Sequence, residues 1–146
     1  MFVYGQTAAN AIAVMSYLAA DTARRAGSGE IAEARNISKA LTAKLLTHLA
    51  AARLVLGQPG PGGGYKLAKH PSEISLLDVV SLFEKIDPPS VCAFGRGWCG
   101  TGEPCPLHNP IEQIVTVNRE FLEGTRLSVF LGAKKQNFSS EAISNH

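Results

Sequence analysis

A run of glycine and proline between two β-prone segments constrains this chain more than any other feature. Residues 57–64 read Gly-Gln-Pro-Gly-Pro-Gly-Gly-Gly, and none of these side chains can fill a hydrophobic core. Short β-prone segments flank the run at residues 54–56 and 65–67. This arrangement predicts a β-hairpin whose loop projects from the body of the protein.

Helical patterns precede the hairpin. Apolar residues recur at three- and four-residue spacing over residues 6–26, which predicts a helix. A break at Gly27-Ser28-Gly29 separates it from a short helix over residues 30–35. Ser38 is a good N-cap for a longer helix that runs to about residue 53. The apolar stripe of this longer helix comprises Leu41, Leu45, Leu49 and Ala52, helped by His48.

A second helical region follows the hairpin. Ser75 and Asp78 have the spacing of a capping box and predict a helix to about residue 85. Residues 88–109 are rich in Gly, Pro and Cys and predict a loop. Pro110 suits a helix first turn and opens a long helix to about residue 125. The pattern leaves the state of residues 127–131 open.

The order helix, short helix, longer helix and glycine-rich hairpin is that of a winged helix-turn-helix. The predicted fold class is therefore mainly α with a small β-hairpin wing. In such a domain the second helix of the helix-turn-helix enters the major groove of DNA. Residues 1–87 are predicted to form this DNA-binding domain.

The charge distribution agrees with a DNA-binding role. The chain has 146 residues, enough for one domain, and a formal net charge of +2. Residues 1–70 hold eight Lys/Arg and three acidic residues, a net charge of +5, whereas residues 71–146 carry −3. A basic half indicates a polyanionic partner. Chance scatter of surface charge is the alternative explanation.

Two sets of residues are candidates for DNA contact. On the longer helix, lysines and a helix N-terminus suit phosphates and guanine edges. In the hairpin, glycines let the backbone come close to DNA. An ordinary solvated helix face and a flexible hairpin tip are the alternatives. The candidates are Ser38, Lys39, Thr42 and Lys44 on the helix and Gln58, Gly62, Gly63 and Lys66 in the hairpin.

Three cysteines and one histidine cluster within the predicted loop. Cys92, Cys99, Cys105 and His108 lie among glycines that allow the loop to fold around one centre. Thiolates select zinc, copper(I) or an iron–sulfur cluster. Structural zinc sites usually contain cysteine pairs two residues apart, and such a pair is absent here, which favours a cluster. Cysteines with no metal and an unrelated histidine are the remaining alternative.

These motifs together resemble one known family. The sequence is similar to the winged-helix bacterial iron–sulfur transcription regulators of the IscR/NsrR/RirA family. The resemblance rests on the wing signature at residues 59–65, on Ile31-Ala32-Glu33 and Ile37-Ser38 in the helix-turn-helix, and on the cysteine loop. It covers about residues 4–131. One departure is Pro59, which stands where the family often has Arg, so that an arginine contact from the wing is absent.

The resemblance implies a homodimer that reads a roughly palindromic site in double-stranded DNA, with DNA affinity controlled by the cluster. It divides the chain into the DNA-binding domain, a cluster loop at 88–109, a dimerisation helix at 110–131 and a disordered tail at 132–146. Some relatives take the fourth cluster ligand from an acidic residue on the first helix. Residues 1–20 contain no Asp, Glu or His. This favours His108 and a 2Fe-2S cluster over a 4Fe-4S cluster, which would need water, a small thiol or an amide such as Asn10.

Other classes of function fit the sequence less well. A zinc-stabilised interaction module without a DNA role is the alternative function. An enzyme is not expected, because the sequence shows no second constellation of base and nucleophile, and no small-molecule substrate is implied. No apolar run is long enough to span a membrane, and no signal peptide is recognisable. We therefore expect a cytoplasmic protein with no membrane partner.

Overall fold

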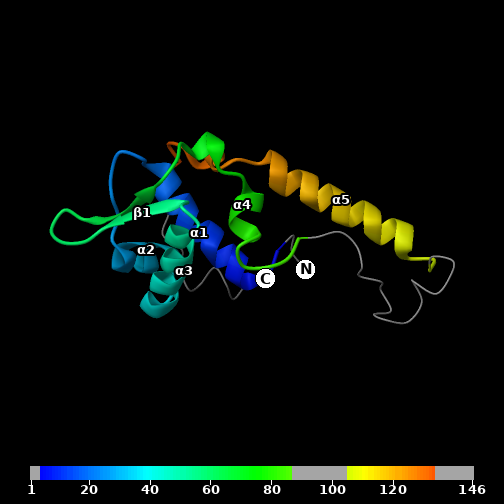
Figure 1. The fold of residues 1–146 in the computed structure, drawn as a ribbon, viewed down its shortest axis with the longest axis horizontal. Coiled ribbons are helices and arrows are strands. Elements are labelled where there is room, and N and C mark those ends of the chain that lie inside the picture. Colours follow the sequence, from blue (N-terminus) through cyan, green and yellow to red (C-terminus); the bar gives the residue numbers. More distant parts are fainter. Residues whose placement is uncertain (1–3, 87–104, 134–146) are drawn as a thin grey trace.

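A helical body carries a hairpin at one end and a long helix that extends from the other. The computed structural model describes residues 4–86 and 105–133. Helices α1 (Gln6–Ala20), α2 (Ser28–Arg35) and α3 (Lys39–Ala51) precede the hairpin of β1 (Val55–Gln58) and β2 (Gly64–Leu67). The remaining elements are the 3-10 helix η1 (Pro71–Glu73), α4 (Leu76–Val80), α5 (His108–Gly124) and the 3-10 helix η2 (Leu127–Phe130). Figure 1 shows the hairpin and α5 pointing in opposite directions. The winged helix-turn-helix is confirmed.

The hydrophobic core lies where α1 meets the other helices. α1 contacts α2, α3, α4, β2 and η2, so it is the central element of the body. Its spacing of Ala8, Ile12, Met15 and Ala19 places one whole side in the core, and these residues are at most 7% exposed. Leu122 near the end of α5 and Leu127 in η2 complete the core. The C-terminal part of the described chain therefore belongs to the same body as the helix-turn-helix.

The hairpin is longer than the sequence pattern predicts. β1 and β2 pair in antiparallel fashion from Val55 opposite Leu67 to Gln58 opposite Gly64. The prediction placed the strand ends at residues 56 and 65. Pairing thus extends into the Gly/Pro run. Gly64 has a φ of +123°, and a Cβ there would lie 2.8 Å from the carbonyl oxygen of Ala26, so glycine is needed where the turn before α2 approaches β2.

The first helix is shorter than predicted. α1 ends at Ala20, and Asp21 is extended with a φ of −143°. The helix cannot continue to residue 26, because Ala26 exchanges backbone hydrogen bonds of 2.9 and 2.8 Å with Tyr65 of β2. The turn between α1 and α2 thus pairs with the wing through one β-bridge, between Ala26 and Tyr65.

The other helix ends follow local capping chemistry. Ser75 and Asp78 form the predicted capping box of α4, although α4 ends at Val80 and not near residue 85. α3 begins after the predicted cap Ser38 and ends at Ala51, since Arg53 has a φ of +61° that cannot continue a helix.

The predicted dimerisation segment 110–131 is not one helix. α5 starts at His108, ends at Gly124 and is followed by η2. Residues 127–131, whose state the pattern left open, mostly belong to this 3-10 helix. The turn between α5 and η2 is fixed by a bridge between Ser75 and Arg126 and by the backbone N–H of Leu127, which donates to Ile74 at 2.9 Å. Residues 88–104 of the predicted cluster loop and residues 134–146 of the predicted disordered tail lie outside the described residues.

Candidate DNA-binding surface and cluster-ligand segment

The N-terminus of α3 presents polar groups to solvent. Ser38 accepts a hydrogen bond from the backbone N–H of Leu41 at 3.1 Å, which fixes the first turn. Ser38, Lys39 and Lys44 are exposed, as the prediction of a DNA-reading helix requires. At about 100° of rotation per residue, Lys39 and Lys44 lie on the two flanks of the buried side of α3 that carries Leu45 and Leu49, and Ser38 is exposed at the helix end.

Thr42 is a correction to the predicted contacts. The residue is 0% exposed, and so it cannot touch DNA in this fold. It occupies the helix side of Leu45, Leu46 and Leu49, which follow it by three, four and seven residues. Its Oγ1 is buried and has no hydrogen-bond partner among the described residues. The predicted apolar stripe of α3 was also partly wrong. Thr42 and Leu46 belong to its buried side, and His48 is exposed.

The wing brings the other candidate residues to one end of the molecule. Gln58 and Gly62 are exposed, while Gly63 and Lys66 are half-buried. Gly62 has a φ of +74°, and a Cβ on Gly63 would lie 2.1 Å from the carbonyl oxygen of Gln58. The tight wing turn therefore needs glycine at both positions.

A shallow groove separates the wing from the helix-turn-helix. Its volume is about 690 Å³. Its walls are formed by wing residues 57–60 and 63–65, by Gly27 and Ser28 at the start of α2, and by Thr47 and Ala50 of α3. In the described part of the chain no charged residue lines it. Positive charge for a polyanion must come from side chains around the groove.

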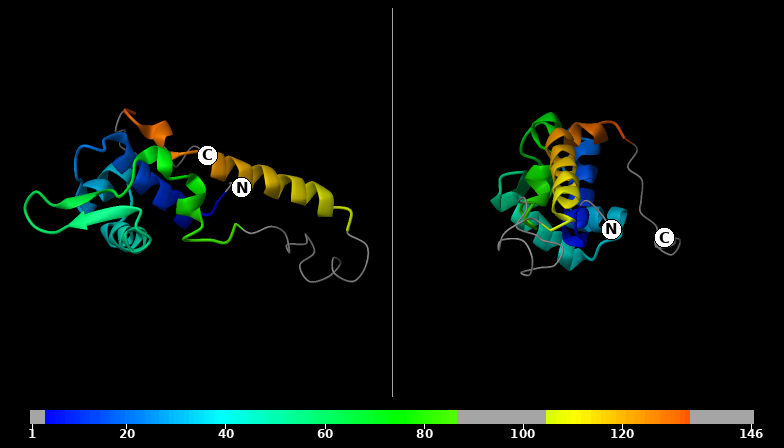
Figure 2. Two further views of the ribbon diagram at one scale, coloured as in Figure 1. Left: turned by 45° about the horizontal axis from the view of Figure 1, so that its top comes forward. Right: turned by 90° about the vertical axis from the view of Figure 1, so that its right-hand side faces the viewer.

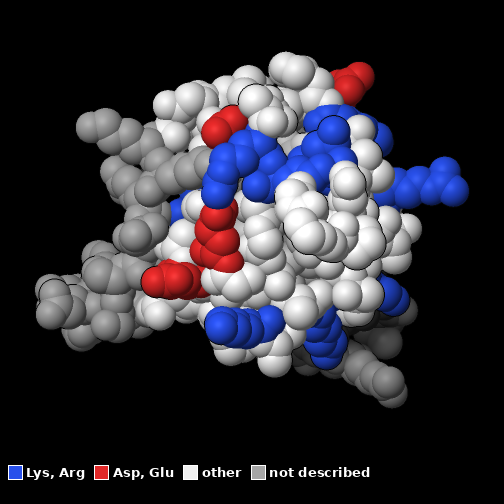
Figure 3. All heavy atoms as spheres, turned by 90° about the vertical axis from the view of Figure 1, so that its left-hand side faces the viewer, with Lys and Arg blue, Asp and Glu red and all other residues white. Residues whose placement is uncertain are grey.

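Basic side chains gather on the face that presents the wing. Figure 3 shows Lys and Arg in a band across this face, with a smaller group below it. Arg35 does not contribute, although it is one of the eight basic residues of the N-terminal half. It is 6% exposed, its Nε donates to the carbonyl of Ala13 at 3.0 Å, and its guanidinium lies 5.2 Å from the ring centroid of Tyr17. Burial lowers the pKa of Arg35. Its role is structural.

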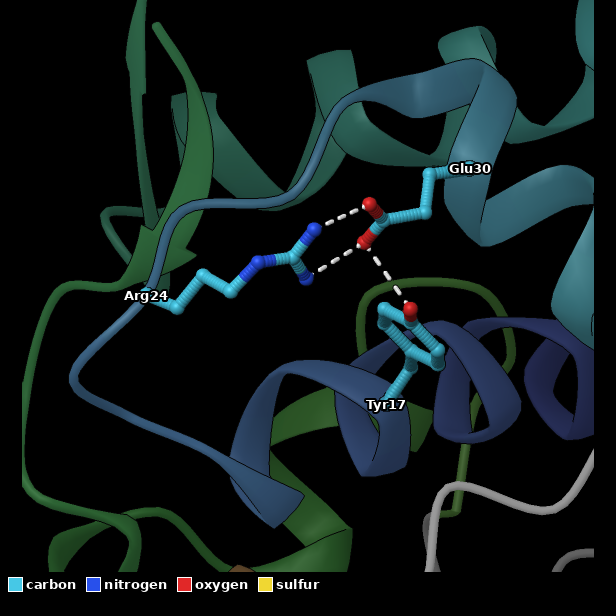
Figure 4. Close-up of polar contacts among 3 residues, drawn as sticks. All are labelled: Tyr17, Arg24 and Glu30. Carbon is cyan, nitrogen blue, oxygen red and sulfur yellow. Dashed lines mark hydrogen bonds and ion pairs between the residues drawn. The ribbon is translucent and has the colours of Figure 1, made fainter. Parts of the chain in front are cut away.

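A polar cluster of Tyr17, Arg24 and Glu30 joins α1 to α2 (Figure 4). The Glu30 carboxylate accepts the Tyr17 hydroxyl at 2.8 Å and Arg24 Nη1 at 2.9 Å. Burial, followed by the hydrogen bond to Glu30, raises the pKa of Tyr17. Glu30 also lies in the first turn of α2, where the helix dipole favours an acidic residue. The sequence pattern did not reveal this cluster, because Tyr17 follows the apolar periodicity of α1.

Two of the four predicted cluster ligands are described, and they lie on one turn of the chain. Cys105 is 3% exposed, and the backbone N–H of His108 donates to its carbonyl at 3.0 Å. His108 Nε2 lies 3.9 Å from the Glu112 carboxylate, one turn along α5. A thiol and an imidazole are donors that suit iron or zinc. The donor chemistry of this turn therefore fits the group that the resemblance implies.

The other two predicted ligands, Cys92 and Cys99, lie outside the described residues. Within the residues that the structure describes, no group of three or more His, Cys, Asp or Glu side chains could hold a metal ion. Asn10, the amide considered for a 4Fe-4S cluster, is half-buried on α1 and accepts a hydrogen bond from Gln6 Nε2 at 3.1 Å.

α5 carries two apolar faces. One buries Leu122 in the body. The other is exposed to solvent, and its members recur at seven-, three- and four-residue spacing. These members are Leu107, Ile114, Val117 and Phe121, which are 45–64% exposed. Figures 1 and 2 show that the N-terminal part of α5 extends beyond the helical body.

Comparison with known proteins decides the family. The sequence profile of Rrf2, described as an iron-dependent transcriptional regulator, matches residues 4–132. The chain belongs to the Rrf2 family. This Rrf2 protein is 26% identical to a candidate HTH-type transcriptional regulator of Aquifex aeolicus. The alignment spans 137 residues and covers 92% of this chain and 95% of the relative. It is 32% identical to IscR of Aliivibrio salmonicida over 67% of this chain and 58% of that protein.

Solved structures confirm the fold of this Rrf2 protein. CymR, the global cysteine regulator of B. subtilis, has a TM-score of 0.75 and 25% identity, covering 89% of this chain and 97% of CymR. IscR of T. potens has a TM-score of 0.67 at 21% identity, covering 85% and 82% of the two chains. The family and the HTH-type relatives above are described as transcriptional regulators, and DNA-binding regulation is therefore the function class of this Rrf2 protein. No helix in the described part of the chain is long and apolar enough to cross a membrane.

Proposed function

We propose that the protein is a dimeric transcription regulator whose affinity for DNA is controlled by an iron–sulfur cluster. The observation that carries this proposal is the shared face of α3 and the wing. The second half of α3, with Thr47 and Ala50, shares a groove with the glycine-rich hairpin, and the exposed, capped start of the same helix carries Lys39, with Lys44 one turn further along. Helix N-termini and lysines bind phosphates, and a helix of this kind fits the major groove.

The proposed DNA contacts come from two elements. Ser38, Lys39 and Lys44 meet the major groove and its phosphates, and Gln58, Gly62, Gly63 and Lys66 bring the wing to the adjacent backbone. A regulator that acts on chromosomal DNA works in the cytoplasm, which agrees with the sequence expectation.

The exposed face of α5 supports dimerisation. Large apolar side chains on a projecting helix are costly in water and are typical of a partner-binding surface. A second copy of α5 would cover Ile114, Val117 and Phe121. A two-fold dimer would present two copies of α3 to a roughly palindromic operator.

The cluster ligands would be Cys92, Cys99, Cys105 and His108. Cys105 and His108 already share one turn, and the imidazole must be neutral to bind iron. A histidine ligand supports a 2Fe-2S cluster over a 4Fe-4S cluster. When bound, the cluster supplies a group that responds to iron, redox state or nitric oxide.

The DNA-binding proposal is tested by salt-dependent binding to a duplex that the wild-type protein enriches from a randomised library. We expect Lys39→Ala and Lys44→Ala each to lower affinity and to reduce the slope of log K against log salt by about 0.9 for each lost phosphate contact. Arg126→Ala is the control, because it removes an exposed basic side chain between α5 and η2, outside the helix-turn-helix and wing. Unchanged binding by both α3 variants would refute the assignment of α3.

The cluster proposal is tested on protein isolated without oxygen. We expect visible absorption and Mössbauer spectra of an iron–sulfur cluster, with equal iron and sulfide, and loss of these signals in Cys105→Ser. A colourless protein that holds zinc would instead support the zinc-stabilised interaction module.

A further inference from the structure

Residues 81–86 form a junction between α4 and the cysteine segment. The carboxylate of Glu84 accepts the backbone N–H of Gly5 at 2.8 Å, directly before α1. The carbonyl oxygen of Ile86 accepts a hydrogen bond from Arg119 Nη1 on α5 at 3.3 Å. Arg119 itself is held by an ion pair to Glu123 at 3.0 Å. The junction is therefore tied to both α1 and α5.

The same junction reaches α3 through an aromatic contact. The ring of Phe83 stacks on His48, with centroids 5.9 Å apart and planes inclined by 24°. His48 follows Lys44 by four residues, so the two side chains are neighbours on the surface of α3. Phe83 therefore contacts the part of α3 that carries a proposed DNA contact.

The junction also lies at the base of the cysteine segment. In the sequence, Ile86 leads directly into residues 87–104, which contain Cys92 and Cys99. At its other end this segment enters α5 at His108, and α5 returns to Ile86 through Arg119. A change in the cysteine segment that moves Ile86 or α5 would therefore also move residues 81–86, which include Phe83.

We propose that Phe83 is a positioning residue for α3, and that residues 81–86 transmit the state of the cysteine segment to the DNA-reading side of α3 through the stack on His48. This inference rests on the proposed function, since it names the route by which the cysteine segment regulates DNA binding. In this proposal the two states of the segment differ in how Phe83 holds His48, and this difference changes DNA affinity. An aromatic pair of this kind is worth about a two- to tenfold change in an equilibrium constant.

The test compares DNA affinity of the full-length protein with its cluster and after removal of metal by a chelator, on the enriched duplex. For each variant the quantity of interest is the ratio of the two dissociation constants. We expect Phe83→Ala to bring this ratio closer to one by about two- to tenfold. Phe83→Tyr keeps an aromatic ring and should restore the wild-type ratio. Leu82→Ala is the matched control, because it removes a neighbouring side chain that is 41% exposed.

The outcomes separate this inference from the proposed function. A wild-type protein that binds the duplex equally with and without the cluster overturns the proposed regulation and this inference together. A wild-type ratio that differs from one and is fully kept by Phe83→Ala overturns the route through Phe83 alone. A ratio lost equally in Leu82→Ala would also overturn it, because the effect would then come from general loosening of the junction.

A second readout needs no cluster. Hydrogen exchange of the metal-free protein should show faster exchange in the second half of α3 for Phe83→Ala and wild-type exchange in α2. Unchanged exchange throughout α3 would contradict a positioning role for Phe83. Equally faster exchange in α2 would mean that the variant unfolds the whole helix-turn-helix and would also contradict that role.

Discussion

At the scale of single residues, the polar side chains of α3 divide into exposed and buried ones. Lys39 and Lys44 face solvent, whereas Thr42 lies in the core with an Oγ1 that has no partner among the described residues. A polar residue at the sequence position of a DNA contact can thus be part of the core. Its place one turn after the cap Ser38 did not show which way the Thr42 side chain points. Thr42 precedes Leu45 by three residues, and this spacing places it among buried leucines.

Thr42 therefore predicts a stabilising substitution. Thr42→Val replaces the unpartnered hydroxyl with a methyl group of the same shape, and we expect the free energy of unfolding to rise by about 1 kcal/mol. DNA affinity should not change. Thr47→Val is the control, since Thr47 is exposed and its Oγ1 donates to Ala43 at 2.9 Å. Urea unfolding measures the effect, and a destabilised Thr42→Val would show that Oγ1 is satisfied in solution.

Tyr17 predicts a pH dependence of stability. Its pKa is raised in the folded protein above the ordinary value of 10.0, first by burial and then by Glu30. Above pH 10 the unfolded chain releases this proton while the folded chain keeps it, so stability must fall as pH rises through the folded pKa. Below pH 10 the contribution of Tyr17 is fully present.

The comparison of the wild-type protein with Tyr17→Phe isolates this effect. Tyr17→Phe lacks the hydroxyl bond to Glu30, and we expect it to be less stable by about 1 kcal/mol at neutral pH. The difference should shrink above pH 10, as followed by thermal unfolding at a series of pH values. A constant difference up to alkaline pH would mean that the phenol ionises equally in both states.

At the scale of elements, the wing depends on backbone space that only glycine leaves. We expect Gly63→Ala to lower the free energy of unfolding by more than about 1 kcal/mol, because its Cβ would lie 2.1 Å from the carbonyl oxygen of Gln58. DNA affinity should fall with it, since the wing turn must open.

Gly124→Ala is the matched control for the wing variant. Apart from its chain neighbours and the backbone of α5 itself, no atom lies within 4 Å of a Cβ at Gly124, the last residue of α5, and so alanine should be tolerated. Circular dichroism and urea unfolding of both variants measure the difference. Equal stability would show that the wing turn adapts to a side chain.

The elements also show where sequence patterns stop short. Caps that depend on neighbouring residues were predictable, as Ser38 and the Ser75–Asp78 box demonstrate. The exclusion of residue 26 from α1 was not, because Ala26 pairs with Tyr65, which is far away in the sequence. Local periodicity contains no information about such pairing.

At the scale of the whole molecule, α5 is the one long element with a large exposed apolar surface among the described residues. We expect Ile114→Glu and Val117→Glu to convert the proposed dimer into monomers, because each would place charged side chains in the interface. Sedimentation velocity measures the oligomeric state, and affinity for a palindromic duplex should fall in parallel.

Thr116→Glu provides the control for α5. Thr116 is exposed on nearly the opposite side of the helix from Ile114, at about 100° of rotation per residue. This variant should sediment like the wild-type protein. A dimer that survives both Ile114→Glu and Val117→Glu would exclude this face as the interface.

The sequence by itself determined the order of helices and hairpin, the caps, the glycine-dependent wing and the set of soft metal donors, because these features depend on neighbouring residues and on residue type. Only the tertiary structure decided which polar residues face outward. It buried Thr42 and Arg35, joined Tyr17 to Glu30 and placed Phe83 on His48. These outcomes depend on which surfaces of distant segments meet, and a pattern along one chain does not record that.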